Sequence, residues 1–346
     1  MDTTTAAVAG INAVVSMQAL GEKLYFDENL SSPVGQSCAS CHLPEAGFAD
    51  PDSHFPVSEG VISGRFGNRN TPTASYAAAI PELQFDILRN RFLGGQFLDG
   101  RANTLEEQAQ GPFLNPLEMN NTKQGVIEAV RLSNYASDFE IVFGQDSLDD
   151  VDSAYEEIAQ AIAEFERTEL FSPFSAKLDA VQARTAVFTQ AEQRGLNLFT
   201  GKADCGRCHG LTNTQSVLTD FSYHNLGVQA NINNPFYSLD SSLNSDGNAF
   251  VDLGLGAVLN DARENGKFRV PTLRNVAITA PYMHNGVFDS LQQVIDFYNS
   301  RDTNPDQPPA EVDVNKDRGI GDLRLTQGEI DDLIAFLNTF TDGYNQ

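Results

Sequence analysis

Apolar residues recur at helical spacing in four stretches of the chain, which predicts a mainly α-helical protein. The clearest stripe lies in residues 153–170, and weaker stripes lie in 11–26, 290–299 and 326–340. No stretch carries a clear strand pattern, so no sheet is predicted. In chain order, the residues of the four stripes are Ile11, Val14, Val15, Leu20 and Leu24; Tyr155, Ile158, Ala159, Ile162 and Phe165; Leu291, Val294, Ile295 and Tyr298; and Ile330, Leu333, Ile334, Leu337 and Phe340.

Helix starts are marked by a hydroxyl residue that is followed three positions later by glutamate, the capping-box pattern. Ser290 precedes the third stripe and is expected to begin that helix. Residues 122–133 predict one further, weaker helix. The four capping-box residues are Thr104, Ser153, Thr189 and Thr326.

Two long segments, 43–72 and 229–260, are rich in Gly, Asn, Ser, Pro or Asp and predict irregular loops. Residues 171–180 separate the helix at 153–170 from the second half of the chain. We therefore expect two helical domains with long loops, residues 1–170 and residues 171–346.

Two copies of a Cys-x-x-Cys-His motif, CASCH and CGRCH, use all four cysteines of the chain. This motif is typical of covalent haem c attachment, in which both thiols add to haem vinyl groups. The adjacent histidine becomes the proximal ligand of the iron. One haem c in each half is therefore predicted, held by Cys38, Cys41 and His42 in the first motif and by Cys205, Cys208 and His209 in the second.

Two alternatives use the same cysteines. Two Cys-x-x-Cys pairs can hold one zinc ion through four thiolates, and a single pair can act as a redox dithiol. Zinc does not explain why a histidine follows both pairs, and a dithiol motif usually lies early in a βαβ unit, which this sequence lacks. Haem attachment is the interpretation that accounts for both histidines.

The net charge of −25 over 346 residues argues against a nucleic-acid partner and against binding to anionic membrane surfaces. It allows a basic redox partner, although an acidic coat that keeps the protein dissolved is an equally good explanation. No apolar run approaches the ~20 residues that a membrane span requires. The opening MDTTTAAVAG is not a signal peptide. A periplasmic or cell-surface location is expected from the haem motifs alone, with any signal peptide removed.

Several further segments, in this order, accompany the two haem motifs. They are GEKLYFD, CASCHLPEAGFAD, GNRNTPT, GQFLDGRANTLEEQAQGP, CGRCHG, HNLGV, FRVPTLRNVAITAPYMHNGVF and VIDFYNS. Together they resemble the bacterial dihaem cytochrome c peroxidase family, including its MauG-like branch. The resemblance implies two cytochrome-c-like domains, peroxide chemistry at the N-terminal haem and electron transfer at the C-terminal haem.

The resemblance also implies particular residues. The family's catalytic glutamine and glutamate fall on Gln96 and Glu106. A calcium ion near the domain interface is implied, with the side chain of Asn70 and the backbone carbonyls of Thr279 and Pro281 as ligands.

The chemistry of the two catalytic candidates can be understood from their residue types. A carboxylate in an apolar pocket can take a proton from peroxide and return it to the leaving oxygen, since burial raises its pKa. That is the role expected of Glu106, and a neutral amide such as Gln96 can orient peroxide. Without the resemblance, Glu106 would be a solvated acid on a helix face beside Glu107, and Gln96 an ordinary loop amide.

Tyr298 decides the branch of the family. It lies fourteen residues after His284, where peroxidases of the family generally have methionine and MauG-like proteins have tyrosine. Tyr298 shares the apolar face of the 290–299 helix, so it points inward and is expected to ligate the second iron opposite His209. A core tyrosine with another hydroxyl partner is the plain alternative, and Met283 is a less favoured ligand.

The first iron is expected to be open on its distal side. The distal histidine of classical members falls on Ile62, and His54 lies out of register and is expected to be an ordinary loop residue. His224 and His284 lie in family-like motifs, with structural and functional roles equally open. Arg101 and Arg274 are expected to pair either with haem propionates or with surface acids.

The family's inter-haem tryptophan has no counterpart, because the chain contains no tryptophan. Phe85, Phe92 and Tyr76 are the aromatic candidates for the space between the haems.

The sequence therefore predicts a hydrogen-peroxide-dependent dihaem oxidoreductase of the MauG-like branch, which oxidises a redox partner protein. The alternative enzyme reduces peroxide to water with electrons from a donor cytochrome or cupredoxin. A dihaem electron carrier without turnover is the alternative outside the enzymes.

Overall fold

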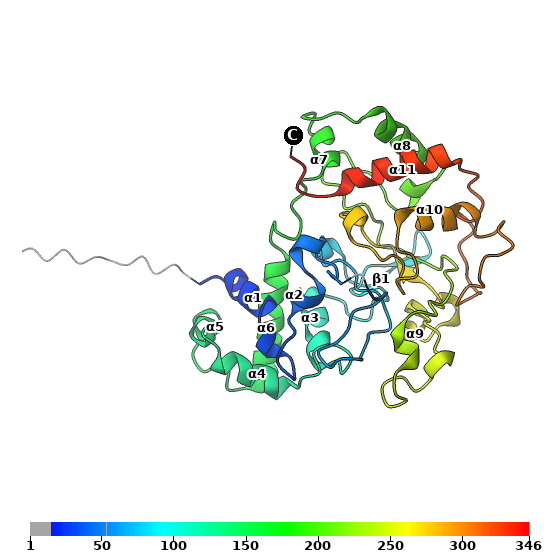
Figure 1. Cartoon of the computed structure of the whole chain (residues 1–346). Helices are drawn as coiled ribbons and strands as arrows, with labels where there is room; N and C mark the ends of the chain where they lie inside the picture. The colour runs from blue at the N-terminus through cyan, green and yellow to red at the C-terminus, as the bar shows by residue number, and fades with distance from the viewer. Residues whose placement is uncertain (1–14, 53, 346) are drawn as a thin grey trace, which may run out of the picture.

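The computed structural model describes residues 15–52 and 54–345 and is mainly helical, with long loops between the helices (Figure 1). The first half contains α1 (Met17–Tyr25), α2 (Cys38–Cys41), α3 (Leu105–Leu114), α4 (Lys123–Leu132), α5 (Ala136–Phe143) and α6 (Val151–Glu166). The expected opening helix is confirmed from Met17, where the Ser16 hydroxyl accepts a hydrogen bond from the amide of Ala19 at 3.1 Å. Ile11 and Val14 lie outside the described residues.

Helix α6 is the centre of the first half and packs against α1, α3 and α4. Its predicted apolar stripe is buried, but the predicted cap at Ser153 is wrong. The helix begins one turn earlier, because the Asp150 carboxylate accepts a hydrogen bond from the Ser153 amide at 2.8 Å. Gly21 of α1 allows a close approach to α6, since a Cβ there would lie 1.9 Å from the carbonyl oxygen of Ala161.

The second half contains α7 (Lys177–Gln182), α8 (Gln190–Thr200), α9 (Leu255–Leu259), α10 (Leu291–Ser300) and α11 (Gln327–Leu337). The capping boxes at Thr189 and Thr326 are confirmed, and Ser290 caps α10 in the same way. Helices α8 and α11 lie side by side in the upper part of Figure 1. Gly195 makes this contact possible, because a Cβ there would lie 2.1 Å from the carbonyl oxygen of Asp332.

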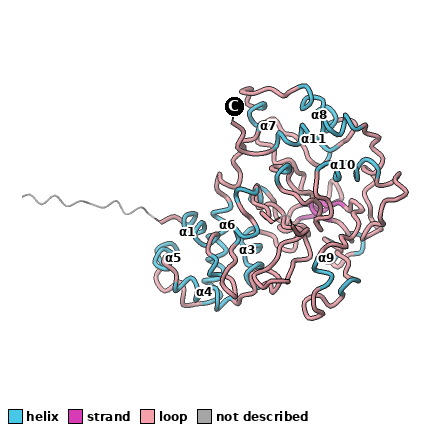
Figure 2. Tube along the Cα trace, viewed as in Figure 1, coloured by secondary structure: helices cyan, strands magenta, loops and turns pink. Residues whose placement is uncertain are grey.

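Irregular chain fills the space between the helices (Figure 2). The described part of 43–72 contains no α-helix, and 229–260 contains only α9 near its end. The prediction of no sheet needs a small correction, because two antiparallel pairs of short strands are present. These are β1 (Gln84–Asp86) with β2 (Arg91–Leu93), and β3 (Tyr223–His224) with β4 (Phe268–Arg269).

The apolar side chains form separate clusters in the two halves of the chain. One cluster contains buried residues from Leu20 to Phe171, and another contains residues from Leu178 to Phe340. Each cluster lies next to one Cys-x-x-Cys-His motif, because Cys38 packs against the first and Cys205 against the second. Within residues 15–52 and 54–345, no helix is long and apolar enough to cross a membrane.

Candidate functional site

The first haem motif occupies the short helix α2 and its end. Ser37 precedes the helix, and its amide donates a hydrogen bond to the Ser40 hydroxyl at 3.0 Å. Cys38 and Cys41 are three residues apart on this helix, so their thiols lie on the same face. His42 follows directly as the residue that ends the helix.

The imidazole of His42 is held in one orientation by the backbone. Its Nδ1 lies 3.1 Å from the carbonyl oxygen of Phe48. A carbonyl oxygen can only accept, so Nδ1 carries the proton and Nε2 keeps a free lone pair. Burial lowers the pKa of His42, which favours the neutral ring that a metal requires.

The second motif uses the same arrangement. Cys205 begins a 3-10 turn, Cys205–Arg207, and Cys208 and His209 follow. The His209 Nδ1 lies 2.9 Å from the carbonyl oxygen of Leu218, and burial lowers the pKa of this ring also. Both histidines therefore present Nε2 as the ligand atom, because a metal-binding histidine usually donates its other ring N–H to a carbonyl or carboxylate oxygen.

The two alternatives for the cysteines are not supported. Among the described residues, no three His, Cys, Asp or Glu side chains are grouped to hold a metal ion, and the two cysteine pairs pack against different apolar clusters. Burial raises the pKa of the Cys41 and Cys205 thiols to about 12, whereas a reactive dithiol needs a lowered thiol pKa. Covalent attachment to a haem requires neither that the two cysteine pairs meet at one metal ion nor that their thiols have a lowered pKa.

A large, mainly apolar cavity lies beside the second motif and contains Cys205, Cys208 and His209 in its wall. The rest of the wall fits a flat apolar macrocycle, because aliphatic and aromatic side chains surround the histidine. They include Phe199, Val217, Val276, Leu291, Val294 and Ile295.

Tyr298 lines the same cavity from helix α10, as the apolar stripe of that helix predicts. Burial raises the pKa of its phenol. Within the described part of the chain, its hydroxyl has no hydrogen-bond partner, although a buried tyrosine hydroxyl usually has one. A haem iron ligated by His209 would supply that partner. Met283 lines the cavity too.

The two predicted catalytic residues are placed in different settings. Glu106 lies in the first turn of α3, and its side chain is 30% exposed. Its carboxylate accepts a hydrogen bond from Arg167 at 2.6 Å, and its pKa is lowered because hydrogen bonds and this charge outweigh partial burial. Gln96 is buried, and its amide donates to the carbonyl oxygen of Ala77 at 3.3 Å.

Glu118 has the environment that was expected of Glu106. Burial raises its pKa, and its neighbour Met119 lies in the same apolar cluster as Ala39 and Cys38 of the first haem motif. Its carboxylate accepts a hydrogen bond from the Asn115 amide at 2.8 Å. One feature of the sequence could have pointed to Glu118. Glu118 stands between apolar neighbours in the segment PLEMN, whereas Glu106 is followed by another acid.

The segment that carries Glu118 is fixed by the loop that follows the first motif. The Val61 amide donates to the carbonyl oxygen of Glu118 at 2.9 Å. Gly60 approaches the same segment so closely that a Cβ would lie 2.4 Å from the carbonyl oxygen of Leu117. This contact connects the long loop after His42 to the carboxylate, and gives that loop a structural role.

Another acid, which is buried, lies near the same motif. Glu166, the last residue of α6, is buried, and burial raises its pKa to about 8. Its charge raises the pKa of Cys38 and of Tyr25, whose hydroxyl donates to the carbonyl oxygen of His42 at 2.9 Å. Two acids, Glu118 and Glu166, therefore lie near the first motif, and burial raises the pKa of both.

Comparisons with known proteins agree with this geometry. A family model described as di-haem cytochrome c peroxidase matches residues 16–185. The methylamine utilization protein MauG of Paracoccus denitrificans is 38% identical over 94% of this chain and 89% of its own length. The chain belongs to the dihaem cytochrome c peroxidase family. A second family member, the cytochrome c551 peroxidase of Nitrosomonas europaea, is 30% identical over 94% of this chain and 80% of its own.

Solved structures of the family share the fold. The crystal structure of the diheme peroxidase BthA from Burkholderia thailandensis has a TM-score of 0.84 and 32% identity, and the match covers 94% of this chain and 86% of that chain. A MauG-like protein associated with microbial copper homeostasis has a TM-score of 0.72 and 30% identity, covering 94% and 89%. The predicted fold of two cytochrome-c-like domains is confirmed, and the chain is an enzyme of the dihaem peroxidase kind with two haems.

The three residues expected to bind calcium in this dihaem peroxidase lie near one another. The Asn70 side-chain amide lies 2.6 Å from the carbonyl oxygen of Pro281 and 3.5 Å from that of Met283. Thr279 is two residues before Pro281. Oxygen donors of this type suit calcium, which takes about six to eight oxygen ligands, the remainder being water. Binding would require the Asn70 amide to turn its oxygen toward the ion.

The remaining histidines have partners within the protein. His54, which was expected to be a loop residue, is exposed, with its Nδ1 2.6 Å from Asp52. His284 stacks on the Phe268 ring at 4.0 Å between centroids, and its Nε2 lies 3.2 Å from Glu311. The His224 Nδ1 lies 2.6 Å from Asp317, which raises the pKa of His224 to about 9.

The two arginines that were also left open contact acids of the protein. Arg101 pairs with Asp99 at 3.0 Å, and its guanidinium lies 3.6 Å from the centre of the Phe97 ring. Arg274 is fully buried and pairs with Asp179 at 2.5 Å. The expectation of a surface salt bridge is therefore wrong for Arg274, because this pair lies in the interior.

Proposed function

We propose that this dihaem peroxidase uses hydrogen peroxide to oxidise a partner protein, as in the MauG-like branch of the family. The observation that carries the proposal is Tyr298, a partly buried phenol that lines the cavity beside the second motif without a hydrogen-bond partner among the described residues. A phenolate is a hard, anionic haem ligand, whereas methionine raises the reduction potential of the iron. Tyrosine at this position favours holding oxidising equivalents over accepting electrons from a high-potential donor.

The chain's residues have separate roles in this proposal. Cys38, Cys41 and His42 hold the first haem, which supplies the iron where peroxide binds and is reduced. An acid beside it removes a proton from peroxide and delivers a proton to the leaving oxygen. Cys205, Cys208, His209 and Tyr298 hold the second haem.

Glu118 is the acid that we favour for this proton transfer. A general acid needs a pKa near the working range, and burial raises the pKa of Glu118 while Arg167 holds the pKa of Glu106 low. Glu106 remains the assignment that follows from the resemblance, with Gln96 as the orienting amide. Replacing each glutamate in turn distinguishes the two assignments, as argued in the Discussion.

Three further features belong to the proposal. One calcium ion binds at Asn70, Thr279 and Pro281 near the interface of the halves, and the domains meet at residues 170 and 171. A periplasmic or cell-surface location follows from haem c, which is assembled outside the cytoplasm. The partner is a protein, and the net charge of −25 favours a basic one.

Two measurements test the proposal. The ferric protein should show one high-spin haem by EPR, from an iron without a distal protein ligand, and one low-spin haem with histidine and tyrosine ligands. Peroxide should then oxidise the fully ferric protein without prior reduction, giving a long-lived oxidised state. Two low-spin haems, or rapid turnover with a small reduced cytochrome only after half-reduction, would instead support the donor-dependent peroxidase named among the relatives.

A further inference from the structure

The chain has no tryptophan, so any aromatic relay between the two haem sites must be another residue. Of the three aromatic candidates, Phe85 is 45% exposed and packs edge-to-face on Phe92 within the β1–β2 hairpin. Tyr76 is 1% exposed and lines the cavity that contains His209. Tyr76 is also the only one of the three that can lose a proton when it is oxidised.

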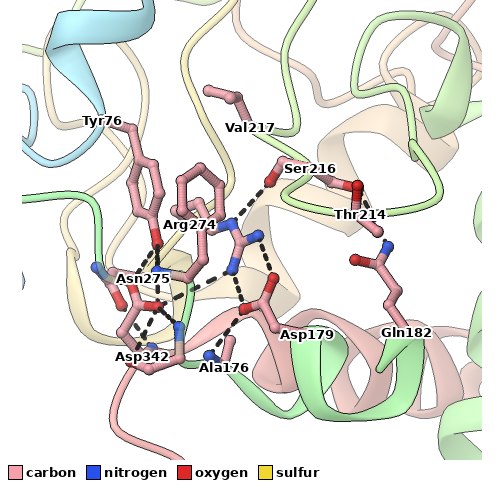
Figure 3. Close-up of polar contacts among 12 residues, drawn as sticks. Tyr76, Ala176, Asp179, Gln182, Thr214, Ser216, Val217, Arg274, Asn275 and Asp342 are labelled. Carbon is pink, nitrogen blue, oxygen red and sulfur yellow. Dashed lines mark hydrogen bonds and ion pairs between the residues drawn. The ribbon is translucent and has the colours of Figure 1, made fainter. Parts of the chain in front are cut away.

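The Tyr76 hydroxyl is bonded to a carboxylate. It lies 3.0 Å from each carboxylate oxygen of Asp342, and it accepts a hydrogen bond from the Phe174 amide at 3.1 Å (Figure 3). The Arg274 guanidinium lies 5.1 Å from the centre of the Tyr76 ring. A positive charge there disfavours a protonated radical cation, so the electron and the proton of the phenol must leave together.

Tyr76 is connected to the first haem motif through backbone and ring contacts. Its amide donates to the carbonyl oxygen of Phe171 at 3.0 Å. The Phe171 ring stacks on the Phe48 ring with 4.0 Å between centroids. The carbonyl oxygen of Phe48 is the partner of the His42 Nδ1 at 3.1 Å.

Tyr76 is connected to the second motif through Arg274. The Nε of Arg274 donates to the carbonyl oxygen of Ser216 at 2.8 Å, as Figure 3 shows. Two residues further along, the carbonyl oxygen of Leu218 is the partner of the His209 Nδ1 at 2.9 Å. Tyr76 therefore lies on a continuous series of contacts between the proximal histidines of the two haem sites.

We propose that Tyr76 is a redox-active residue on the proximal side of both haem sites, and that Asp342 is its proton acceptor. In this step the phenol gives one electron to the oxidant generated from peroxide, and the O–H proton moves to the Asp342 carboxylate. The products are a neutral tyrosyl radical, a neutral aspartic acid and an oxidant reduced by one electron. Re-reduction by the partner protein reverses the proton transfer. The inference rests on the proposed function, which supplies the oxidant.

The pKa of the phenol supports the coupling of the two transfers. Burial raises the pKa of Tyr76 well above its ordinary value, so a phenolate does not form before oxidation. Asp342 also accepts a hydrogen bond from the Ser175 amide at 3.0 Å, which holds its carboxylate in place in both states.

The test is EPR of samples frozen after peroxide is added to the ferric holoprotein, with optical spectra of the haems recorded in parallel. A tyrosyl radical signal is expected, and ring-deuterated tyrosine should narrow it. Tyr76→Phe should abolish the signal while the optical change caused by peroxide remains. If Tyr76→Phe does not fold, Asp342→Asn tests the inference instead. The side-chain amide at position 342 still accepts a hydrogen bond from Tyr76 but cannot take its proton. The signal is expected to be lost in this variant as well.

Two other buried tyrosines provide matched controls. The Tyr135 hydroxyl donates to Asp27 and so has the same chemistry, but among the described residues Tyr135 has no hydrogen bond or ring contact with either motif, Phe171 or Arg274. Tyr25 lies next to the first motif but donates to a carbonyl oxygen, which cannot take a proton. Tyr135→Phe and Tyr25→Phe should keep the signal. Loss of the signal in Tyr25→Phe, or an unchanged signal in Asp342→Asn, would overturn the inference.

The same samples separate the inference from the proposed function. If peroxide changes the haem spectra of the unmodified protein but no tyrosine signal forms, the inference fails and the proposed function stands. If peroxide leaves the haem spectra unchanged, both fail.

Discussion

The guanidinium of Arg274 donates to both carboxylate oxygens of Asp179, at 2.5 and 2.7 Å, although the two residues are 95 positions apart (Figure 3). Arg274 has no exposed surface, and its Nε is also bonded to a backbone carbonyl. This pair joins the start of α7 to the segment before α10 and lies beside Asp342 and Tyr76. A largely buried ion pair therefore ties residues 171–180, which follow the first half, to the segment before α10.

Arg274→Met should destabilise the protein strongly, because it leaves the Asp179 carboxylate buried without its partner. Removing one member of a buried ion pair typically costs about 3–5 kcal/mol of the free energy of unfolding. Denaturant unfolding of the holoprotein measures this change. Arg263→Met is the matched control. Arg263 pairs with Asp261 at 2.6 Å, but its side chain is 86% exposed, so a much smaller loss of stability is expected. Equal losses in the two variants would contradict the buried-pair argument.

Local patterns predicted much of the fold. The apolar stripes placed α6, α10 and α11, and the caps at Thr189 and Thr326 were predicted because a capping box involves residues only three apart. Ser153 was the wrong cap because Asp150 supplies a carboxylate one turn earlier. The short strands were missed because two or three residues are too few for an alternating pattern.

Contacts between distant residues limited the prediction of the site. The motifs predicted the ligand histidines, and the stripe of α10 predicted the inward direction of Tyr298. Sequence does not show that Arg167, sixty-one positions away, pairs with Glu106. Nor does it show that the loop at Gly60 packs on the segment that carries Glu118.

Glu118→Gln should slow the reaction with peroxide by ~10²–10⁴-fold, the range typical of general acid–base catalysis. The amide keeps the size of the side chain and its acceptor for Asn115 but cannot exchange the proton. Stopped-flow absorbance of the ferric holoprotein measures the rate. Glu106→Gln is the paired variant and should have a much smaller effect, because Glu106 is ion-paired. A large effect in Glu106→Gln with none in Glu118→Gln would restore the assignment from resemblance.

Tyr298→Met should raise the reduction potential of the second haem, since methionine favours the reduced iron and phenolate the oxidised iron. The long-lived state formed with peroxide should become short-lived. Spectroelectrochemistry and the decay of the optical change measure the two effects. Tyr282→Phe is the control, because Tyr282 lines the same cavity but donates to the carbonyl oxygen of Val276 at 2.8 Å. Unchanged potentials in Tyr298→Met would exclude Tyr298 as a ligand.

Asn70→Ala should remove bound calcium, because it deletes the one side-chain ligand of the proposed site. Metal analysis of the purified protein should show one calcium per chain in the unmodified protein and a reduced amount in the variant. A chelator should reproduce the loss. Asn68→Ala is a nearby control, since the Asn68 side chain lies 3.4 Å from Asp252, away from Pro281. Calcium bound equally in both variants would place the ion elsewhere.

Glu166 should make the stability of the protein depend on pH. Burial raises its pKa from the ordinary 4.5 to about 8. Between these two pH values the folded protein holds a proton that the unfolded chain releases. Glu166 stabilises the folded protein fully below its pKa in the unfolded chain. This contribution to the free energy of unfolding is lost as the pH rises toward the pKa of Glu166 in the folded protein. The expected slope is about −1.4 kcal/mol per pH unit from this group.

Glu166→Gln should remove this slope, because the amide does not titrate, and the variant should gain stability relative to the unmodified protein as pH rises. Denaturant unfolding at several pH values between 5 and 8, within the window set by Glu166, measures the difference. Glu156→Gln on the exposed face of the same helix should keep the slope of the unmodified protein. A slope that persists in Glu166→Gln would mean that another group near the first haem motif, such as Glu118, releases the proton.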